Sequence, residues 1–196
     1  KIFRRNKFLI DICNKKKIKV IVMSSDHVFN NGNKTNFNST TPNPKSNYGK
    51  LKFRIEKLYK RYSNDFKILR PSNVYDNNFQ KVGLLKNLKD SYIKKQIFIF
   101  DNIKIFRNFI HVNDLVTIIF ITIGKFDLSP QILNIPHENF KLSKILSLFK
   151  IKFKYDLKIL NLNKKNQKNI IMSNMHIVKE LNYKYKHTLS KTVQKL

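Results

Sequence analysis

The sequence predicts an α/β protein built on a parallel β-sheet. Short apolar runs at residues 18–23 and 66–69 are typical of strands that are covered on both faces. Amphipathic helical segments lie between such runs, at residues 3–14 and again after Ser46. Because helix and strand alternate along the chain, right-handed parallel crossovers are expected. At 196 residues, the chain can bury one ordinary core, or one domain with a small addition.

The first half of the chain gives clear signals for individual elements. Residues 30–47 are rich in Asn, Thr and Pro and predict a loop, whose length suggests a functional role. The helix after Ser46 carries apolar residues at steps of four, three and four, which predict one buried stripe. This stripe is formed by Leu51, Ile55, Leu58 and Tyr62.

The second half predicts further alternation. Residues 114–124 favour a helix capped by Asn113 or Asp114. Many of their side chains are β-branched, so a strand is also possible if propensity alone is considered. The remaining expected elements are helices at 83–95, 142–149, 174–181 and from 189, strands at 97–100, 109–112, 132–135 and 158–162, and a polar loop at 164–168.

The charge of the chain is unusual, at +28, with 40 Lys and Arg against 12 Asp and Glu. Such a charge is compatible with a basic module that binds nucleic acid. However, the lysines are spread along the whole chain and Ala is absent, which indicates a general bias in composition. A nucleic-acid partner is therefore unlikely on the sequence, although a basic surface would also attract a substrate that carries phosphates.

Other features limit the class of protein. Cys13 is the single cysteine, so an internal disulfide is excluded and we expect a reducing, cytoplasmic location. No apolar run is long enough for a membrane span, and no cluster of Cys or His suggests a metal site. The chain begins with Lys1 inside a predicted helix, so we expect it to be a piece of a longer protein.

Hydroxyl groups and a Tyr/Lys pair surround the end of the first strand. Ser24 and Ser25 follow the apolar run directly, and Tyr48 and Lys52 open the next helix. Four residues make just over one helical turn, so the phenol and the ammonium share a face. Ligands of open α/β sheets bind at the carboxyl ends of the strands. The pattern therefore predicts a site for proton transfer.

The Tyr-x-x-x-Lys spacing carries little weight alone. Six of the 40 basic residues are Arg, which leaves 34 Lys (40 − 6), and with 8 Tyr in 196 residues chance gives about 1.4 such pairs. Tyr48 is the one tyrosine that has Lys at this offset. The order of the segments is more specific than the pair: a strand, Ser-Ser-Asp, a Pro-containing loop, the Tyr/Lys helix, and a strand that ends in Arg-Pro-Ser-Asn.

Four segments in this order resemble the extended short-chain dehydrogenase/reductase family, which includes NAD-dependent epimerases, dehydratases and 4-keto-sugar reductases that act on nucleotide sugars. The segments lie at residues 22–29, 42–52, 69–75 and 107–114 and cover most of the chain. The resemblance implies the C-terminal part of a Rossmann-like doubly wound parallel sheet and a smaller α/β substrate domain. It places the cofactor-binding part at 1–75 and the substrate-binding part mainly at 76–196, with 105–125 returning to the first sheet.

The resemblance also implies roles for individual residues. Tyr48 would be the acid/base, and the Lys52 ammonium would favour its phenolate and bind the ribose of NAD or NADP. Ser25 would bind the reacting hydroxyl or ketone. Pro71 would lie against the cofactor, and Asn73 and Arg107 would hold the diphosphate of the nucleotide sugar. A homodimer is also compatible with the family.

Each residue also has a simpler interpretation. Ser25 and Asn73 are common turn residues, and Lys52 and Arg107 are two of 40 basic residues. His111 is expected to be structural.

In the family, dehydratases carry Glu after Asp, whereas His27 follows Asp26 here, which argues against dehydration. The segment around Asp26 favours a 4-keto-sugar reductase, and the segment around Arg107 favours an epimerase.

The sequence departs from the family in several places. The glycine-rich phosphate loop is absent, since the four glycines are Gly32, Gly49, Gly83 and Gly124. In addition, the family has an acidic residue, an aspartate and a glycine where this chain has Asn108, Asn113 and Asp76. Without the phosphate loop the chain lacks most of the cofactor site, so we expect the full-length parent to be the active enzyme and this piece alone to be inactive. A truncated relative without catalytic activity is the alternative.

Overall fold

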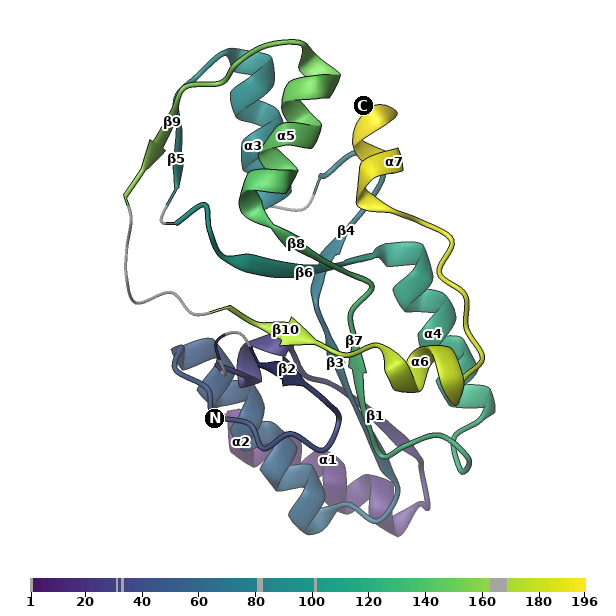
Figure 1. Ribbon diagram of the computed structural model, residues 1–196. Helices are drawn as coiled ribbons and strands as arrows, with labels where there is room; N and C mark the ends of the chain where they lie inside the picture. Colours follow the sequence, from purple (N-terminus) through teal and green to yellow (C-terminus); the bar gives the residue numbers. More distant parts are fainter. Residues whose placement is uncertain (1, 31, 33, 81–82, 101, 163–168) are drawn as a thin grey trace.

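The computed structural model describes residues 2–30, 32, 34–80, 83–100, 102–162 and 169–196, so the loop predicted at 164–168 lies outside the described residues. The predicted α/β fold is confirmed (Figure 1). Three parallel strands form a sheet in the order β1-β3-β7. These strands are β1 (Val20–Met23), β3 (Phe66–Pro71) and β7 (Ile132–Ile135).

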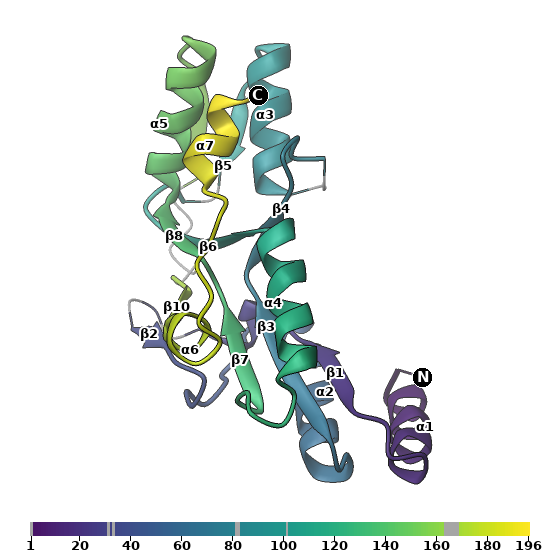
Figure 2. The same ribbon diagram turned by 90° about the vertical axis from the view of Figure 1, so that its right-hand side faces the viewer.

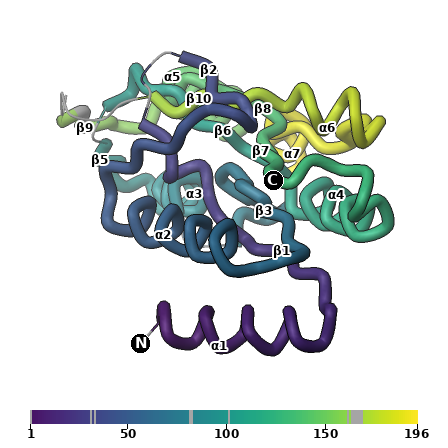
Figure 3. Tube along the Cα trace, turned by 90° about the horizontal axis from the view of Figure 1, so that it is seen from below, coloured from purple at the N-terminus to yellow at the C-terminus, as the bar shows by residue number. Residues whose placement is uncertain are grey.

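Helices cover both faces of this sheet (Figures 2 and 3). Successive residues of a strand point to opposite faces, and the middle strand β3 illustrates this. Ile68 packs with residues of α1 (Ile2–Lys15) and α2 (Asn47–Tyr62). Leu69 packs with residues of α4 (Val112–Gly124) and α6 (Met175–Lys179). The sheet is therefore doubly wound, as predicted.

A second apolar core lies in the upper part of Figure 1. It is formed mainly by α3 (Leu84–Lys94), α5 (Leu142–Phe153) and α7 (Leu189–Gln194) together with strand residues. Here β4 (Asn73–Tyr75) pairs in parallel with β6 (Phe106–His111), and β6 pairs antiparallel with β8 (Glu138–Lys141).

Five short elements complete the described fold. A 3₁₀ turn, η1 (Asp26–Val28), follows β1. The strand β5 (Phe98–Phe100) pairs in parallel with β9 (Ile159–Asn161), and β2 (Thr35–Asn36) pairs in parallel with β10 (Ile171–Met172). Residues 105–125 were expected to return to the first sheet. Within this segment α4 covers the first sheet, whereas β6 pairs with β4 and β8.

Three local predictions were wrong. The loop expected at residues 30–47 contains the short strand β2, which forms because β10, distant in sequence, pairs with it. The cap of α4 is His111, whose ring Nδ1 accepts a hydrogen bond from the backbone of Asn113 at 3.2 Å. The stripe expected on α2 is also displaced, because Glu56 and Tyr59 are buried while Tyr62 is 37% exposed. The reason is that α2 packs against two neighbours, α1 and the strand β3, so its buried surface is not one narrow apolar line.

No helix in the described part of the chain has the length and the apolar character of a membrane span. Among the same described residues, no group of three or more His, Cys, Asp or Glu side chains is placed to hold a metal ion.

Candidate functional site

A cavity of about 250 Å³ opens at the carboxyl ends of β1 and β3. Its position agrees with the rule that ligands of open α/β sheets bind beyond these strand ends. The polar part of its wall is formed by the segment after β1, the start of α2 and the segment that leaves β3. The residues from these three segments are Ser24, Ser25, Asp26, His27, Tyr48, Pro71, Ser72 and Asn73.

Tyr48 stands at the start of α2. The helix begins here because Ser46 caps it, accepting a hydrogen bond from the backbone of Gly49 at 3.0 Å. Gly49 allows a close approach, since a Cβ at this position would lie 2.1 Å from the carbonyl oxygen of His27. The His27 and Tyr48 rings meet edge to face at 5.7 Å. The phenol therefore lies beside the segment that carries Ser25, and its side chain is 51% exposed.

Lys52 lies one turn after Tyr48 on the same helix. Its ammonium donates a hydrogen bond to the carbonyl oxygen of Met23 at 2.9 Å and lies 5.7 Å from the centre of the Tyr48 ring. An ammonium has three N–H donors, and the contact with Met23 uses one of them. Lys52 is therefore fixed at the end of β1, beside Tyr48, although it does not line the cavity itself.

Ser25 is held by its neighbours in η1. Its hydroxyl donates to a carboxylate oxygen of Asp26 at 3.1 Å and accepts from the backbone of His27 at 3.2 Å. Burial raises the pKa of Asp26, although His27 and hydrogen bonds from Ser25 and Asn108 oppose this shift. In the observed contacts the Asp26 carboxyl accepts from both Ser25 and Asn108.

A second cavity, of about 260 Å³, adjoins the first, because Asp26, His27 and Asn73 line both. Arg107 from β6 and Lys45 from the loop before α2 line the second cavity as well. Asn73 is oriented by a hydrogen bond from its side-chain amide to the carbonyl oxygen of Asn108 at 2.9 Å. Two cations and an amide line this cavity together with the carboxyl of Asp26, and the cations make it suitable for an anionic group.

The structure thus distributes the sequence-predicted residues over two adjoining cavities. Ser25, Tyr48, Pro71 and Asn73 line the first, and Asn73 and Arg107 line the second. The fixed position of Lys52 is beside the first cavity, over the ring of Tyr48.

Sequence reasoning missed two buried residues near the site. Asn108 was interpreted only as a departure from the family, yet its amide donates to Asp26 at 3.4 Å and its oxygen accepts from the backbone of Met172 at 3.1 Å. Glu56 was not singled out, although it lies four residues after Lys52 and therefore on the same helix face. That spacing is the signal that would have indicated it.

Comparison with solved structures supports the fold. The chain superposes on UDP-glucuronic acid 4-epimerase from Bacillus cereus, in complex with NAD, with a TM-score of 0.83 at 20% identity, covering 97% of this chain and 64% of that one. For MoeE5 in complex with UDP-glucuronic acid and NAD, the TM-score is 0.82 at 17% identity, and the coverage is 97% and 67%.

A third solved structure is UDP-N-acetylglucosamine 4-epimerase from Methanobrevibacter ruminantium M1, in complex with UDP-N-acetylmuramic acid. Its TM-score is 0.78 at 17% identity, and the match covers 97% of this chain and 65% of that one. The chain therefore spans about two thirds of the length of these proteins. No curated protein sequence matches the chain.

A family model gives the assignment. The model of the NAD-dependent epimerase/dehydratase family matches residues 4–135, which include β1, α2, β3 and α4 and therefore the predicted residues Ser25, Tyr48 and Lys52. The resemblance of the four sequence segments and the doubly wound sheet agree with this match. The chain belongs to the NAD-dependent epimerase/dehydratase family.

Proposed function

We propose that this chain carries the acid/base site and part of the substrate site of an enzyme that oxidises or reduces a nucleotide sugar with NAD or NADP. The observation that supports this most is that Ser25 and Tyr48 line one cavity while the Lys52 ammonium lies 5.7 Å from the Tyr48 ring centre. An epimerase would use both half-reactions at this site, and a 4-keto-sugar reductase would use one.

Each residue has a defined part in the proposed chemistry. Tyr48 takes the proton of the sugar hydroxyl during oxidation, or returns it to the oxygen during reduction. The positive charge of Lys52 stabilises the phenolate in between. Ser25, whose position is set by Asp26 and His27, binds the reacting oxygen and orients it toward the phenol. Bound NAD or NADP supplies the hydride acceptor or donor.

The residues present fit the reactive end of such a cofactor. The contact with Met23 leaves Lys52 two N–H donors that can reach ribose hydroxyls. Pro71 lines the same cavity and offers an apolar surface to a nicotinamide ring. None of the four glycines forms the family's phosphate loop, so we assign no residue to the cofactor's diphosphate.

The second cavity supports the assignment of the substrate's diphosphate. Arg107 and Lys45 provide positive charge, and the guanidinium of Arg107 matches the geometry of phosphate oxygens. Because Asn73 lines both cavities, we propose that the sugar occupies the first cavity and the phosphates the second. Solved relatives hold UDP-glucuronic acid or UDP-glucose, so these compounds are suitable probes.

The first test uses turnover. The full-length parent protein is mixed with NAD and UDP-glucuronic acid or UDP-glucose, and NADH is followed by its absorbance in single-turnover experiments. We expect Tyr48→Phe to lower the rate by about 10²- to 10⁴-fold, as loss of a general acid/base does. Tyr62→Phe, at the far end of the same helix, is the matched control. Equal rates for the two variants would refute the role of Tyr48.

The second test uses binding and needs no turnover. We expect Arg107→Ala to weaken UDP binding about tenfold in calorimetry, as loss of a charge-assisted hydrogen bond implies. Arg54→Ala, which removes an exposed arginine of α2, should leave binding unchanged. If the chain binds UDP through Arg107 yet gives no turnover, the alternative of a non-catalytic relative is favoured.

The division into a cofactor-binding part, residues 1–75, and a mainly substrate-binding part, residues 76–196, belongs to the same proposal. It is supported by two apolar clusters, one formed by buried residues of α1, β1, α2 and β3 and the other formed mainly by α3, α5 and α7. The division is not complete, because β7 and α4 pack with the first sheet. A homodimer and a cytoplasmic location remain predictions from the sequence.

A further inference from the structure

The buried carboxylate of Glu56 is bound by donors from two strands. Its side chain is fully buried on α2. One oxygen accepts from the Ser24 hydroxyl at 2.5 Å and from Nε of Arg70 at 2.9 Å, and the other accepts from Nη2 of Arg70 at 2.7 Å. Arg70 is fully buried as well, and its guanidinium lies 5.0 Å from the centre of the Phe29 ring.

Each member of this network is next to a residue of the candidate site. Ser24 precedes Ser25, Arg70 precedes Pro71, and Glu56 lies one turn after Lys52. The network therefore joins β1, α2 and β3, the three elements that carry the acid/base residues and border the first cavity.

Stability alone does not explain why a charged network occupies this position. The free-energy cost of removing two charges from water is about as large as the attraction between them in a buried ion pair. A protein with well-packed apolar residues in their place is therefore often equally stable or more stable. Here the balance is less favourable still, because Nη1 of Arg70 is buried and has no hydrogen-bond partner among the described residues. What apolar side chains cannot supply is a fixed direction of approach, which the fork of Arg70 provides.

We propose that Glu56 and Arg70 are positioning residues, which hold the Tyr48/Lys52 helix in register with the strand end that carries Ser25. The bond from Ser24 to Glu56 is adjacent to the Met23 carbonyl that receives the Lys52 ammonium. A shift of α2 along the sheet would break both contacts together. The significance for catalysis rests on the proposed function, whereas the positioning itself can be measured without turnover.

The experiment is competitive acetylation of the native chain with acetic anhydride, followed by mass spectrometry. Lys52 reports the register of α2 through its bond to Met23, and Lys57 on the exposed side of the helix is the internal standard. In the double variant Glu56→Met/Arg70→Met, we expect a wild-type denaturation midpoint. The relative rate at Lys52 should rise about three- to tenfold, as loss of one hydrogen bond implies.

A matched control removes another ion pair on a helix. Lys86→Met/Asp90→Met deletes the half-exposed pair on α3, which spans 2.5 Å, and should leave Lys52 unchanged. If the first double variant does not fold, the acetylation rate at Lys52 is measured in Glu56→Gln instead. The amide of Gln has one acceptor oxygen and cannot bind both nitrogens of the Arg70 fork. A wild-type rate at Lys52 in the folded variant would overturn the proposal.

Discussion

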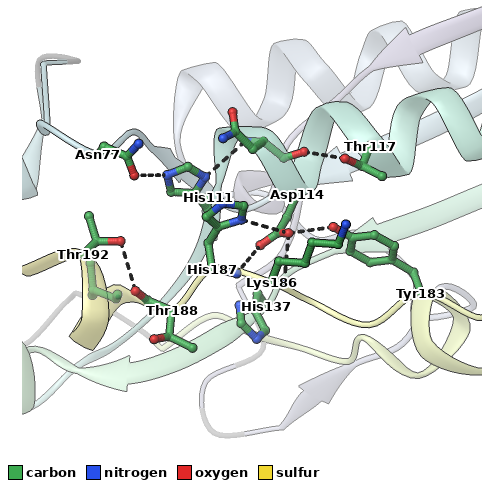
Figure 4. Close-up of polar contacts among 12 residues, drawn as sticks. Asn77, His111, Asp114, Thr117, His137, Tyr183, Lys186, His187, Thr188 and Thr192 are labelled. Carbon is green, nitrogen blue, oxygen red and sulfur yellow. Dashed lines mark hydrogen bonds and ion pairs between the residues drawn. The ribbon is translucent and has the colours of Figure 1, made fainter.

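Asp114, in the first turn of α4, binds the C-terminal segment 183–187 through hydrogen bonds (Figure 4). Its carboxylate is fully buried and accepts hydrogen bonds from the Tyr183 hydroxyl at 2.6 Å and from the backbones of Lys186 and His187 at 3.1 and 3.2 Å. The ring Nδ1 of His187 lies 3.2 Å from one carboxylate oxygen. A negative charge is also favoured in the first turn of a helix.

The substitution Asp114→Asn tests how much this contact contributes to stability. The side chain keeps its shape, but it loses its charge and one of its two acceptor oxygens. A hydrogen bond to a charged group contributes about 1.5–3 kcal/mol. At least one of the three bonds is lost and the others become neutral, so we expect the free energy of unfolding to fall by about 3 kcal/mol at pH 7.

The difference between the two proteins should depend on pH. Burial by itself would raise the pKa of Asp114, but hydrogen bonds from Tyr183, Lys186 and His187 outweigh it and hold the pKa below its usual value. A carboxyl with a lowered pKa in the folded state stabilises the protein above the unfolded pKa, which is about 3.9. The stabilisation is therefore complete at neutral pH and is lost as the pH falls through the lower, folded pKa.

Urea unfolding followed by circular dichroism gives the required free energies. Asp127→Asn is the control, because Asp127 forms an exposed ion pair with Lys19 at 2.6 Å and such pairs contribute about 0–1 kcal/mol. If Asp114→Asn changes stability no more than Asp127→Asn does, the reasoning about the buried carboxylate is wrong.

Two further substitutions test the packing around the candidate site. Gly49→Ala should destabilise the chain by about 1–3 kcal/mol in urea unfolding, because the added Cβ would lie 2.1 Å from the carbonyl oxygen of His27. Gly124→Ala, with open space around its Cβ, should not destabilise it, and equal effects would contradict this reasoning. Asn108→Asp should cost about 2–3 kcal/mol at pH 7, because it places a second carboxylate beside Asp26 in a buried site. This cost should shrink as the pH falls and the two carboxyls share a proton, and a cost independent of pH would count against the pairing.

Local patterns in the sequence were sufficient to predict most elements. The strand at 132–135 has the bounds that the apolar run predicts, and the helix after Ser46 begins where the serine is able to cap it. Both predictions depend on interactions within a few residues of the chain. The four ordered segments also indicated the family that the comparison then confirmed.

Predictions failed where a residue's partner is distant in sequence. Glu56 looks like an ordinary exposed residue of a helix, but its partner Arg70 lies on β3, and the two become neighbours only when α2 packs on the sheet. The prediction of the α4 cap failed for a different, local reason, because His111 and Asn113 are only two residues apart. The chain enters the helix from the strand β6, so the ring of His111, rather than Asn113 or Asp114, accepts the first backbone hydrogen bond.

The sequence by itself determined the order of the helices and of most longer strands, the family, and the types of residue at the candidate site, since these follow from local periodicity and from motifs in a fixed order. The short strands β2, β4, β8 and β10 were not predicted. Only the tertiary structure decided which of the elements and residues meet. It brought Ser25 and Tyr48 to one cavity, set Arg107 beside a second, and buried the ion pair that joins β1, α2 and β3. The physical reason is that contacts between distant segments depend on how the helices pack on the sheet, which no local pattern encodes.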